Sequence, residues 1–182
     1  MIRLVVAYLR DLKMLVKIIS GGQTGVDLAA LDIALKFGVD YGGACTKGRF
    51  NELGQIPVKY KKLFEINYTG KDEKENYSKR TIQNIHDADA TLVLVPKLPL
   101  PKNITDGTTL TVEAVQKTNK PFLIIDLSLK MELNIEKVIN WFGDNDVKVL
   151  NIAGPRESQS PNIYNVSSSF LEALMIQMVI LP

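Results

Sequence analysis

Short apolar segments that are typical of buried strands alternate with helical patterns along almost the whole chain. The expected strands are residues 15–20, 39–44, 63–68, 90–95, 121–126 and 147–152, and the expected helices are residues 25–37, 78–87, 108–117, 133–142 and 163–179. Strands that alternate with helices indicate a mainly parallel sheet with helices on both faces. We therefore expect an α/β, Rossmann-like, doubly wound fold with roughly five main strands.

The length of the chain favours a single domain. Its 182 residues are enough to bury a real core. We expect residues 14–182 to form one Rossmann-like domain that binds a phosphate or a cofactor. Residues 1–13 are interpreted as an N-terminal extension or as an extra helix packed on the domain. The first nine residues carry no cleavage signature and are too short to span a bilayer.

Charge and cysteine content exclude several classes of site. A net charge of +2 predicts neither a nucleic-acid partner nor a membrane partner. Because Cys45 and His86 are the single cysteine and histidine, an intrachain disulfide is impossible and a Cys/His zinc site is not expected. This composition fits a reducing, cytoplasmic setting.

A glycine-rich turn joins the first expected strand to the first expected helix. Gly21, Gly22 and Gly25 predict bare backbone N–H groups at a helix N-terminus, where the helix dipole also favours an anion such as phosphate. The hydroxyl groups of Ser20 and Thr24 can donate to the same phosphate. The turn is neither a Walker A motif nor GxGxxG, which weakens the case for a generic NTPase or dehydrogenase.

Further polar residues fall in loops that the fold brings together. Ligands of doubly wound sheets bind outside the carboxyl ends of the strands. This rule gathers the loops at 20–25, 45–49, 96–109 and 153–158 at one edge of the sheet. The further candidate binding residues in or beside these loops are Gln23, Asp27, Lys47, Gly48, Arg49, Arg80, Thr81, Asn84, Gly107, Thr108, Thr109, Arg156 and Ser158.

Several of these candidates also have a purely structural interpretation. Asp27 either complements the dipole of its helix or contacts a ligand hydroxyl or amide, since a carboxylate would not itself attract phosphate. Residues 47–49 can be a solvated basic turn, and residues 108–109 can cap a helix. Arg80 can pair with an acidic residue on a helix surface, and Arg156 can do so within a turn.

Eight segments together resemble the family of molybdenum cofactor carrier proteins. They are SGGQTGVD at 20–27, AALD at 29–32, GGACTKGR at 42–49, IP at 56–57, RT at 80–81 with Asn84, DADATL at 87–92, GTTLT at 107–111 and AGPRES at 153–158. The segments occur in collinear order across nearly the full domain. As a set they are specific for the family.

The resemblance implies a Rossmann-type fold of the LOG-like, or lysine-decarboxylase-like, group and a cytosolic homo-oligomer, either a dimer or a tetramer. It also implies an anionic small-molecule ligand: molybdenum cofactor, or otherwise a phosphorylated pterin or a nucleotide. Molybdenum cofactor is a pterin with a phosphate and a dithiolene-bound molybdenum oxo centre, and its negative charge suits a basic, glycine-rich edge. A carrier needs no nucleophile, which agrees with the lack of a convincing catalytic cluster.

Four positions depart from the family pattern. Leu28, Ala44, Thr46 and Asp106 stand where arginine, tryptophan, proline and glycine are common. Loss of an arginine that faces the ligand would weaken anion binding by about 1.5–3 kcal/mol. Loss of the aromatic ring would remove a stacking surface for a pterin or a base. These departures leave the fold assignment intact and bear on the identity of the ligand.

Two other functions also fit the sequence. One is a nucleotide-binding sensor without turnover. The other is a hydrolase that releases the base from nucleoside monophosphates, as LOG-like relatives do, with Glu113 as the acid or base beside Arg80 or Arg156. Residues 104–113 match the PGGxGTxxE motif of those relatives only in part. We rank the carrier first, the sensor second and the hydrolase third.

Overall fold

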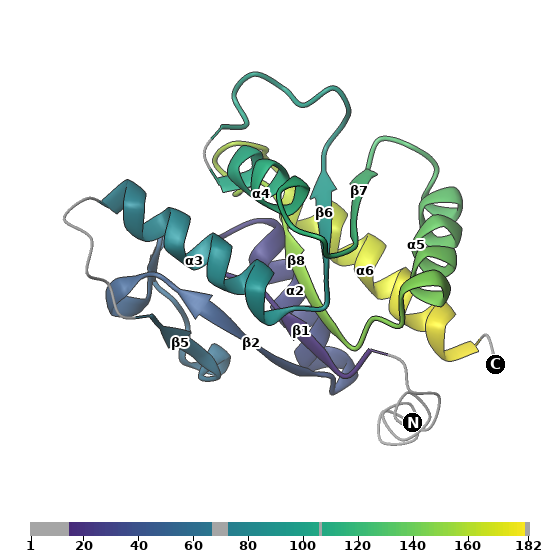
Figure 1. Ribbon diagram of the computed structural model, residues 1–182, viewed down its shortest axis with the longest axis horizontal. Coiled ribbons are helices and arrows are strands. Elements are labelled where there is room, and N and C mark those ends of the chain that lie inside the picture. The colour runs from purple at the N-terminus through teal and green to yellow at the C-terminus, as the bar shows by residue number, and fades with distance from the viewer. Residues whose placement is uncertain (1–14, 67–72, 106, 181–182) are drawn as a thin grey trace.

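A parallel sheet forms the centre of the computed structural model (Figure 1). The structure describes residues 15–66, 73–105 and 107–180, and among these six strands make up the sheet. They are β1 (Lys17–Ile19), β2 (Asp40–Cys45), β5 (Leu63–Glu65), β6 (Ala90–Val95), β7 (Phe122–Asp126) and β8 (Val149–Ala153). Their order across the sheet is β5-β2-β1-β8-β6-β7, and every neighbouring pair is parallel. The predicted α/β doubly wound fold is confirmed.

The six strands of the sheet coincide with the six expected segments, one more than the roughly five main strands anticipated. β5 lies at the edge, and of its three residues only Leu63 is buried. Residues 45–57, expected to be a loop, contain a one-turn helix η1 (Lys47–Arg49) and an antiparallel pair, β3 (Phe50–Asn51) and β4 (Gly54–Gln55). A second short helix, η2 (Val58–Tyr60), follows. The predicted N-terminal extension, residues 1–13, and Asp106 lie outside the described residues.

Helices cover both faces of the sheet. Those described are α2 (Val26–Phe37), α3 (Glu73–Asp87), α4 (Gly107–Gln116), α5 (Met131–Asn145) and α6 (Ile163–Ile180). α2, α5 and α6 lie on one face, and α3 and α4 lie on the other (Figure 1). Each coincides with a predicted helix, although α3 begins earlier than expected. None of these described helices is long and apolar enough to cross a membrane.

The side chains of the central strands divide between the two faces of the sheet. Leu150 and Ile152 of β8 belong to the apolar core, which also contains buried residues of α2 and α6. Asn151, between them, points to the opposite face because side chains alternate along a strand. It is 3% exposed, and its Nδ2 donates to Thr91 Oγ1 of β6 at 3.3 Å. A polar surface therefore lies in the middle of the sheet, on the side of α3 and α4.

The path of the chain creates a switch point beside β1. From β1 the chain passes outward to β2 and β5, and from β6 it passes outward in the other direction to β7. The last strand, β8, then fills the place between β1 and β6. Connections that leave the middle of a sheet in opposite directions, as those of β1 and β6 do, open a crevice at the carboxyl ends, where doubly wound proteins bind ligands.

Candidate functional site

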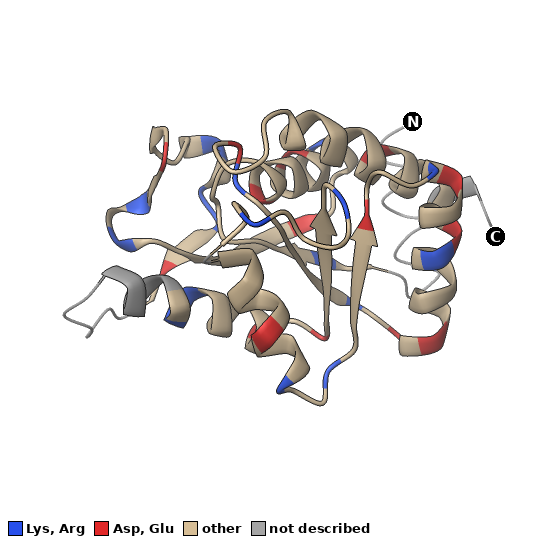
Figure 2. Ribbon diagram, turned by 90° about the horizontal axis from the view of Figure 1, so that it is seen from above, with Lys and Arg blue, Asp and Glu red and all other residues tan. Residues whose placement is uncertain are grey.

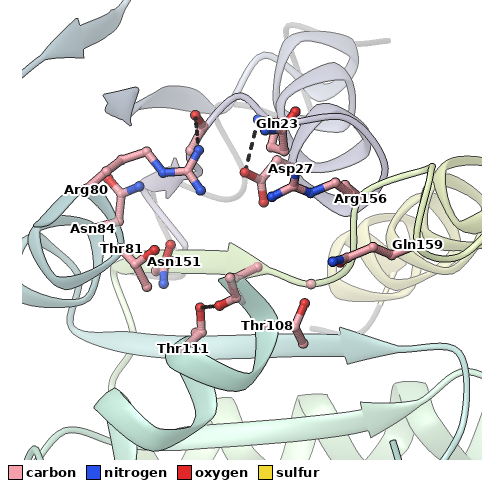
Figure 3. Close-up of a pocket in the computed structure, with 14 residues that line it drawn as sticks. Gln23, Asp27, Arg80, Thr81, Asn84, Thr108, Thr111, Asn151, Arg156 and Gln159 are labelled. Atoms are coloured by element: carbon pink, nitrogen blue, oxygen red, sulfur yellow. Dashed lines mark hydrogen bonds between the residues drawn. The ribbon is translucent and has the colours of Figure 1, made fainter. Parts of the chain in front are cut away.

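A pocket opens at the carboxyl ends of β1 and β8 (Figure 3). Its walls come from the start of α2, from α3, from the start of α4 and from the segment after β8, and it is partly open to solvent. The lining residues are Gly21, Gln23, Asp27, Arg80, Thr81, Asn84, Gly107, Thr108, Thr111, Asn151, Ala153, Gly154, Arg156 and Gln159. Within this described lining there is no aromatic and no large apolar side chain.

Asp27 and Arg80 form one wall, on either side of Gly21. A Cβ atom on Gly21 would lie 2.9 Å from both Arg80 Cζ and Asp27 Oδ2, so a larger residue would displace both charged groups. Arg80 is 8% exposed and Asp27 is 6% exposed. Arg80 Nη1 donates to the Gly21 carbonyl oxygen at 3.3 Å. Burial raises the pKa of Asp27, and the positive charge of Arg80 offsets this only in part.

The glycine-rich turn uses several of its N–H groups within the protein. The N–H of Gln23 donates to Asp27 Oδ2 at 3.1 Å, and the N–H of Thr24 donates to Gln23 Oε1 at 3.1 Å. The N–H of Val26 donates to the Pro155 carbonyl oxygen at 3.3 Å. The expectation of bare donors is therefore wrong for these N–H groups. The carboxylate of Asp27 takes the place that the sequence suggested for an external anion.

The opposite wall is the start of α4. Thr108 is 2% exposed, and its Oγ1 has no hydrogen-bond partner among the described residues. Figure 3 shows this side chain directed toward the open centre of the pocket. A Cβ atom on the neighbouring Gly107 would meet nothing within 4 Å, so the first turn is open. A buried hydroxyl without a partner costs free energy unless a ligand or a water supplies one, which makes Thr108 a contact point for a ligand.

The loop after β8 brings Arg156 to the mouth of the pocket, and Glu52 holds this loop in place. Glu52 accepts hydrogen bonds from Thr24 Oγ1, from Ser158 Oγ and, at 3.1 Å, from the N–H of Ser158. Burial pushes the pKa of Glu52 up, but the hydrogen bonds from Ser158 and Thr24 outweigh it and hold this pKa below its usual value. Glu52 thus ties the loop to the start of α2.

Charged residues of both signs are spread along the helices and loops (Figure 2). Two of the cationic side chains, Arg80 and Arg156, line the pocket and can act on a ligand at short range. Their attraction for an anion is strengthened by burial, because screening by solvent is weak inside a pocket. Arg80 stands beside the Asp27 carboxylate, whereas Arg156 lies closer to the solvent, so the two arginines offer an anion different surroundings.

We expect Glu52→Gln to lower the free energy of unfolding by about 1 kcal/mol or less at pH 7, because the carboxylate is exposed and an amide keeps part of its hydrogen bonds. Since the pKa of Glu52 is lowered on folding, its contribution exists above the pKa of the unfolded chain. The contribution is lost as the pH falls through the folded-state pKa. Urea denaturation at pH 7 and at about pH 3 should therefore show a difference that shrinks in acid.

The control for this prediction is Glu172→Gln. Glu172 is an exposed partner of Lys36 at 2.6 Å on the far side of α2, and it should matter less than Glu52. A Glu52→Gln effect that is equally large at both pH values would contradict the expectation.

Half of the predicted binding residues line the pocket. These are Gly21, Gln23, Asp27, Arg80, Thr81, Asn84, Gly107, Thr108 and Arg156. Ser20, Gly22, Thr24, Gly25, Lys47, Gly48, Arg49, Thr109 and Ser158 are not among the lining residues. Contact of each of these residues with a ligand stays a prediction. Several residues of the second group make hydrogen bonds within the protein instead of lining the pocket.

The basic turn at residues 47–49 holds neighbouring backbone. The guanidinium of Arg49 donates to the carbonyl oxygens of Leu63 at 2.5 Å and Tyr60 at 3.0 Å. The N–H of Gly48 donates to Glu65 Oε2 at 2.8 Å, and the Lys47 residue is exposed. The turn therefore anchors η2 and β5; it follows the carboxyl end of β2 as expected, but its residues are not among those that line the pocket.

The remaining predicted hydroxyl groups are also engaged in the protein. Ser20 Oγ donates to the Ile152 carbonyl oxygen at 2.9 Å, which ties β1 to β8. Thr109 Oγ1 donates to the Ile104 carbonyl oxygen at 3.3 Å. Since Thr24 and Ser158 bind Glu52, Thr108 is the predicted hydroxyl residue whose buried oxygen lacks a partner in the described part of the chain.

The departures from the family pattern fall outside the pocket lining where the structure describes them. Leu28 packs against the apolar core, and Ala44 is fully buried within β2. Asn84 Oδ1 accepts a hydrogen bond from the N–H of Ala44 at 2.7 Å, and Asn84 Nδ2 donates to the carbonyl oxygen of Ala44 at 3.2 Å. Thr46 Oγ1 accepts the N–H of Phe50 at 3.1 Å.

Glu113 is exposed on α4 and does not line the pocket, so the hydrolase hypothesis loses its proposed acid.

Sequence reasoning missed five lining residues: Thr111, Asn151, Ala153, Gly154 and Gln159. One signal was available, because Asn151 interrupts an otherwise apolar strand and a polar residue there indicates a polar site on one face. Gly154 and Ala153 follow the same strand and could have been included with the loop at 153–158. Thr111 belongs to the GTTLT segment at 107–111 and could have been included on that ground, whereas Gln159 carried no such signal.

Comparison with known proteins agrees with this geometry. Residues 18–175 match the family described as the circularly permutated YpsA SLOG family. The chain belongs to this family. Its last strand, β8, pairs with its first described strand, β1.

A solved structure of a relative supports the same assignment. The chain is similar to a protein from Syntrophus aciditrophicus SB described as "Putative molybdenum carrier protein", with 39% sequence identity and a TM-score of 0.78. The match covers 88% of this chain and 94% of that protein. A search of curated proteins gives no significant match. The resemblance predicted from the sequence is confirmed.

Proposed function

We propose that the protein is a carrier that binds molybdenum cofactor in this pocket by its phosphate-bearing end and does not transform it. The observation that supports the site most directly is Thr108, a buried hydroxyl without a partner among the described residues, at the start of α4. The beginning of a helix and a free hydroxyl are groups that hold phosphate. Arg156 adds a positive charge at the mouth of the pocket. The description of the Syntrophus relative supports the choice of cargo.

The lining fits the phosphate end of the cofactor but provides few contacts for its planar ring. Thr108, Gly107 and Arg156 would hold the phosphate, whereas the described lining has no aromatic side chain on which a pterin could stack. When bound, the cofactor supplies a molybdenum centre held by its own dithiolene. In the described part of the chain, no group of three or more His, Cys, Asp or Glu side chains could hold a metal ion. The contribution proposed for the protein is therefore hydrogen bonds and charge toward the organic part.

The direct test is retention of the cofactor. Purified protein is mixed under anaerobic conditions with cofactor released from a molybdoenzyme, and molybdenum and pterin are measured in the protein peak after gel filtration. We expect both to co-elute in a fixed ratio to the chain, with slower oxidation of the pterin than in free solution. A folded protein that retains neither would contradict the proposal. The elution volume also tests the dimer or tetramer that the resemblance implies.

Thr108→Val should weaken cofactor binding at least about tenfold, because a hydrogen bond to a charged phosphate contributes about 1.5–3 kcal/mol. Valine has nearly the same shape as threonine, and removing a buried hydroxyl that has no partner should not lower the melting temperature. Titration of the cofactor by fluorescence or calorimetry measures the dissociation constant of each variant.

Thr109→Val is the matched control, since Thr109 is the next residue along α4 but does not line the pocket. It should leave the affinity unchanged. Equal losses in both variants would mean that Thr108 makes no contact with the ligand.

A further inference from the structure

The hairpin of β3 and β4 stands apart from the central sheet, and its tip is attached to the start of α2. Each of its strands has two residues, and the two strands form a sheet of their own. A two-stranded hairpin is marginally stable by itself. The N–H of Glu52, at the tip, donates to Gln23 Oε1 at 3.0 Å. Asn51 Nδ2 donates to the Gly22 carbonyl oxygen at 3.3 Å. The position of the hairpin therefore depends on the contacts of its tip.

The tip is held by polar contacts, whereas the base of the hairpin is held by the core. Leu53, the large apolar side chain at the tip, is 83% exposed. Ile56, at the base, is 2% exposed and belongs to the apolar core. Its N–H donates to the Arg49 carbonyl oxygen at 2.7 Å. Polar contacts can be exchanged for contacts with water or a ligand at little net cost. The tip can therefore leave the start of α2 while the base stays in place.

The Glu52 carboxylate fills a set of donors at the mouth of the pocket. It accepts hydrogen bonds from Thr24 Oγ1, from Ser158 Oγ and, at 3.1 Å, from the N–H of Ser158. Burial raises the pKa of Glu52, but the hydrogen bonds from Ser158 and Thr24 and the positive charge of Arg156 together hold it below its usual value. Two hydroxyl groups, a backbone N–H and a nearby arginine are typical partners of an anion.

An external anion competes with Glu52 for these donors. Both carry negative charge, so they repel each other and cannot share the same hydrogen bonds. The Glu52 residue is exposed, so its displacement leaves its charge in water and not in the protein interior. Once the hydrogen bonds from Thr24 and Ser158 are lost, the tip keeps few of its attachments. Binding of the anion and movement of the hairpin are therefore coupled.

We propose that Glu52 is an autoinhibitory carboxylate, which occupies the donors at the mouth of the pocket in the free protein and must leave, together with the tip of the hairpin, before an anionic ligand can use them. The hairpin then has a closed and an open position. The apparent affinity for the anion falls in proportion to the fraction of molecules that are open. This inference goes beyond the proposed function, because it concerns access and applies to any anionic ligand.

The test is calorimetric titration of the full chain with inorganic phosphate. We expect Glu52→Ala to bind phosphate about tenfold more tightly than the wild type, which corresponds to an open hairpin in about one free molecule in ten. A carboxylate that only positioned the loop would give the opposite sign, because its loss would loosen Arg156 and Ser158. Glu52→Gln removes the charge but keeps part of the hydrogen bonds, so it should show a smaller gain of the same sign. This second variant carries the test if the alanine variant does not fold.

Two further variants separate the proposed contact from a general effect of charge. Glu65→Ala is the matched control, since Glu65 is an exposed carboxylate that accepts the N–H of Gly48 at 2.8 Å and does not line the pocket. It changes the net charge by the same amount and should leave the affinity for phosphate unchanged. Ser158→Ala in the Glu52→Ala background should remove most of the gain, because the Ser158 hydroxyl is one of the donors that Glu52 had occupied.

Hydrogen exchange measured by NMR detects the displacement itself. In the free protein the N–H of Glu52 donates to Gln23, and the N–H of Ser158 donates to Glu52. Saturating phosphate should speed exchange at the Glu52 N–H, because the tip leaves. Exchange at the Ser158 N–H should stay slow, because phosphate replaces the carboxylate as its acceptor.

Four results would overturn the inference. They are an affinity of Glu52→Ala for phosphate no higher than that of the wild type, equal gains in Glu52→Ala and Glu65→Ala, a gain that survives Ser158→Ala, and exchange at the Glu52 N–H that phosphate does not speed. Absence of phosphate binding in both the wild type and Glu52→Ala would overturn it as well. Each of these results would leave the carrier standing, because retention of the cofactor by the wild type is measured separately. A wild type that fails to retain the cofactor would refute the carrier and leave the autoinhibitory contact standing.

Discussion

Gly25→Ala is expected to lower the free energy of unfolding by about 3 kcal/mol or more, a large share of the stability of a domain of this size. Gly25 precedes α2 with φ 70° and ψ −126°, a backbone conformation that side chains rarely adopt. A Cβ atom there would lie 2.4 Å from the Pro155 carbonyl oxygen and 2.9 Å from Ile163 Cγ2. The Pro155 carbonyl cannot retreat without losing the hydrogen bond from the N–H of Val26. Backbone strain and overpacking therefore add.

The measurement is urea denaturation followed by circular dichroism. Gly143→Ala provides a control with the same chemical change and the opposite expected sign. Gly143 lies within α5, and its added Cβ would meet nothing within 4 Å. Alanine should therefore stabilise the helix by about 0.5–1 kcal/mol. A Gly25→Ala variant as stable as the wild type would mean that the loop after β8 does not close over the start of α2.

The order of the elements could be predicted because the patterns that specify them are local. All six residues of β6 are buried, and their run of Leu and Val had indicated a buried strand over the same residues. Gly38 marks the end of α2, where its φ of 69° lets its N–H donate to the Ala34 and Leu35 carbonyl oxygens. Such signals are contained in a few neighbouring residues. A strand as short as β5 has too few residues to give an equally firm signal; the expected segment at 63–68 extends past β5, and its residues 67–68 lie outside the described residues.

The site was predicted in part, because the partner of a loop is not encoded in the loop itself. The rule for doubly wound sheets placed the site at the carboxyl ends of the strands, and a pocket opens there beside β1 and β8. The same rule could not show that Arg49 would donate to Tyr60 and Leu63, which lie more than ten residues along the chain. The hydrogen bond from the N–H of Gln23 to Asp27 Oδ2 could not be predicted either, because it depends on the orientation of the Asp27 carboxylate.

Arg80→Met is expected to lower the free energy of unfolding by about 3–5 kcal/mol at pH 7, because the buried Asp27 carboxylate then loses the nearby positive charge that partly offsets its burial. Arg80 and Asp27 are both buried, and the charge of Arg80 lowers the pKa of Asp27 against the effect of burial. Methionine preserves much of the length of the side chain, so the loss comes from the charge of Arg80 and from its hydrogen bond to the Gly21 carbonyl oxygen. In an Asp27→Asn background the same substitution should cost much less, and the double-mutant cycle measures the coupling between the two charges.

The loss should also depend on pH in a defined direction. Asp27 has a raised pKa in the folded state, so stability is lost as the pH rises from the unfolded-state value through the folded-state pKa and the buried carboxyl ionises. Without Arg80 this pKa rises further and the loss becomes larger. The deficit of Arg80→Met should therefore be small below the pKa of the unfolded chain, where the carboxyl is protonated in both states, and should grow as the pH rises through the folded-state pKa. A deficit that is constant with pH, together with additivity in the double-mutant cycle, would show that Arg80 acts by packing and not by its charge.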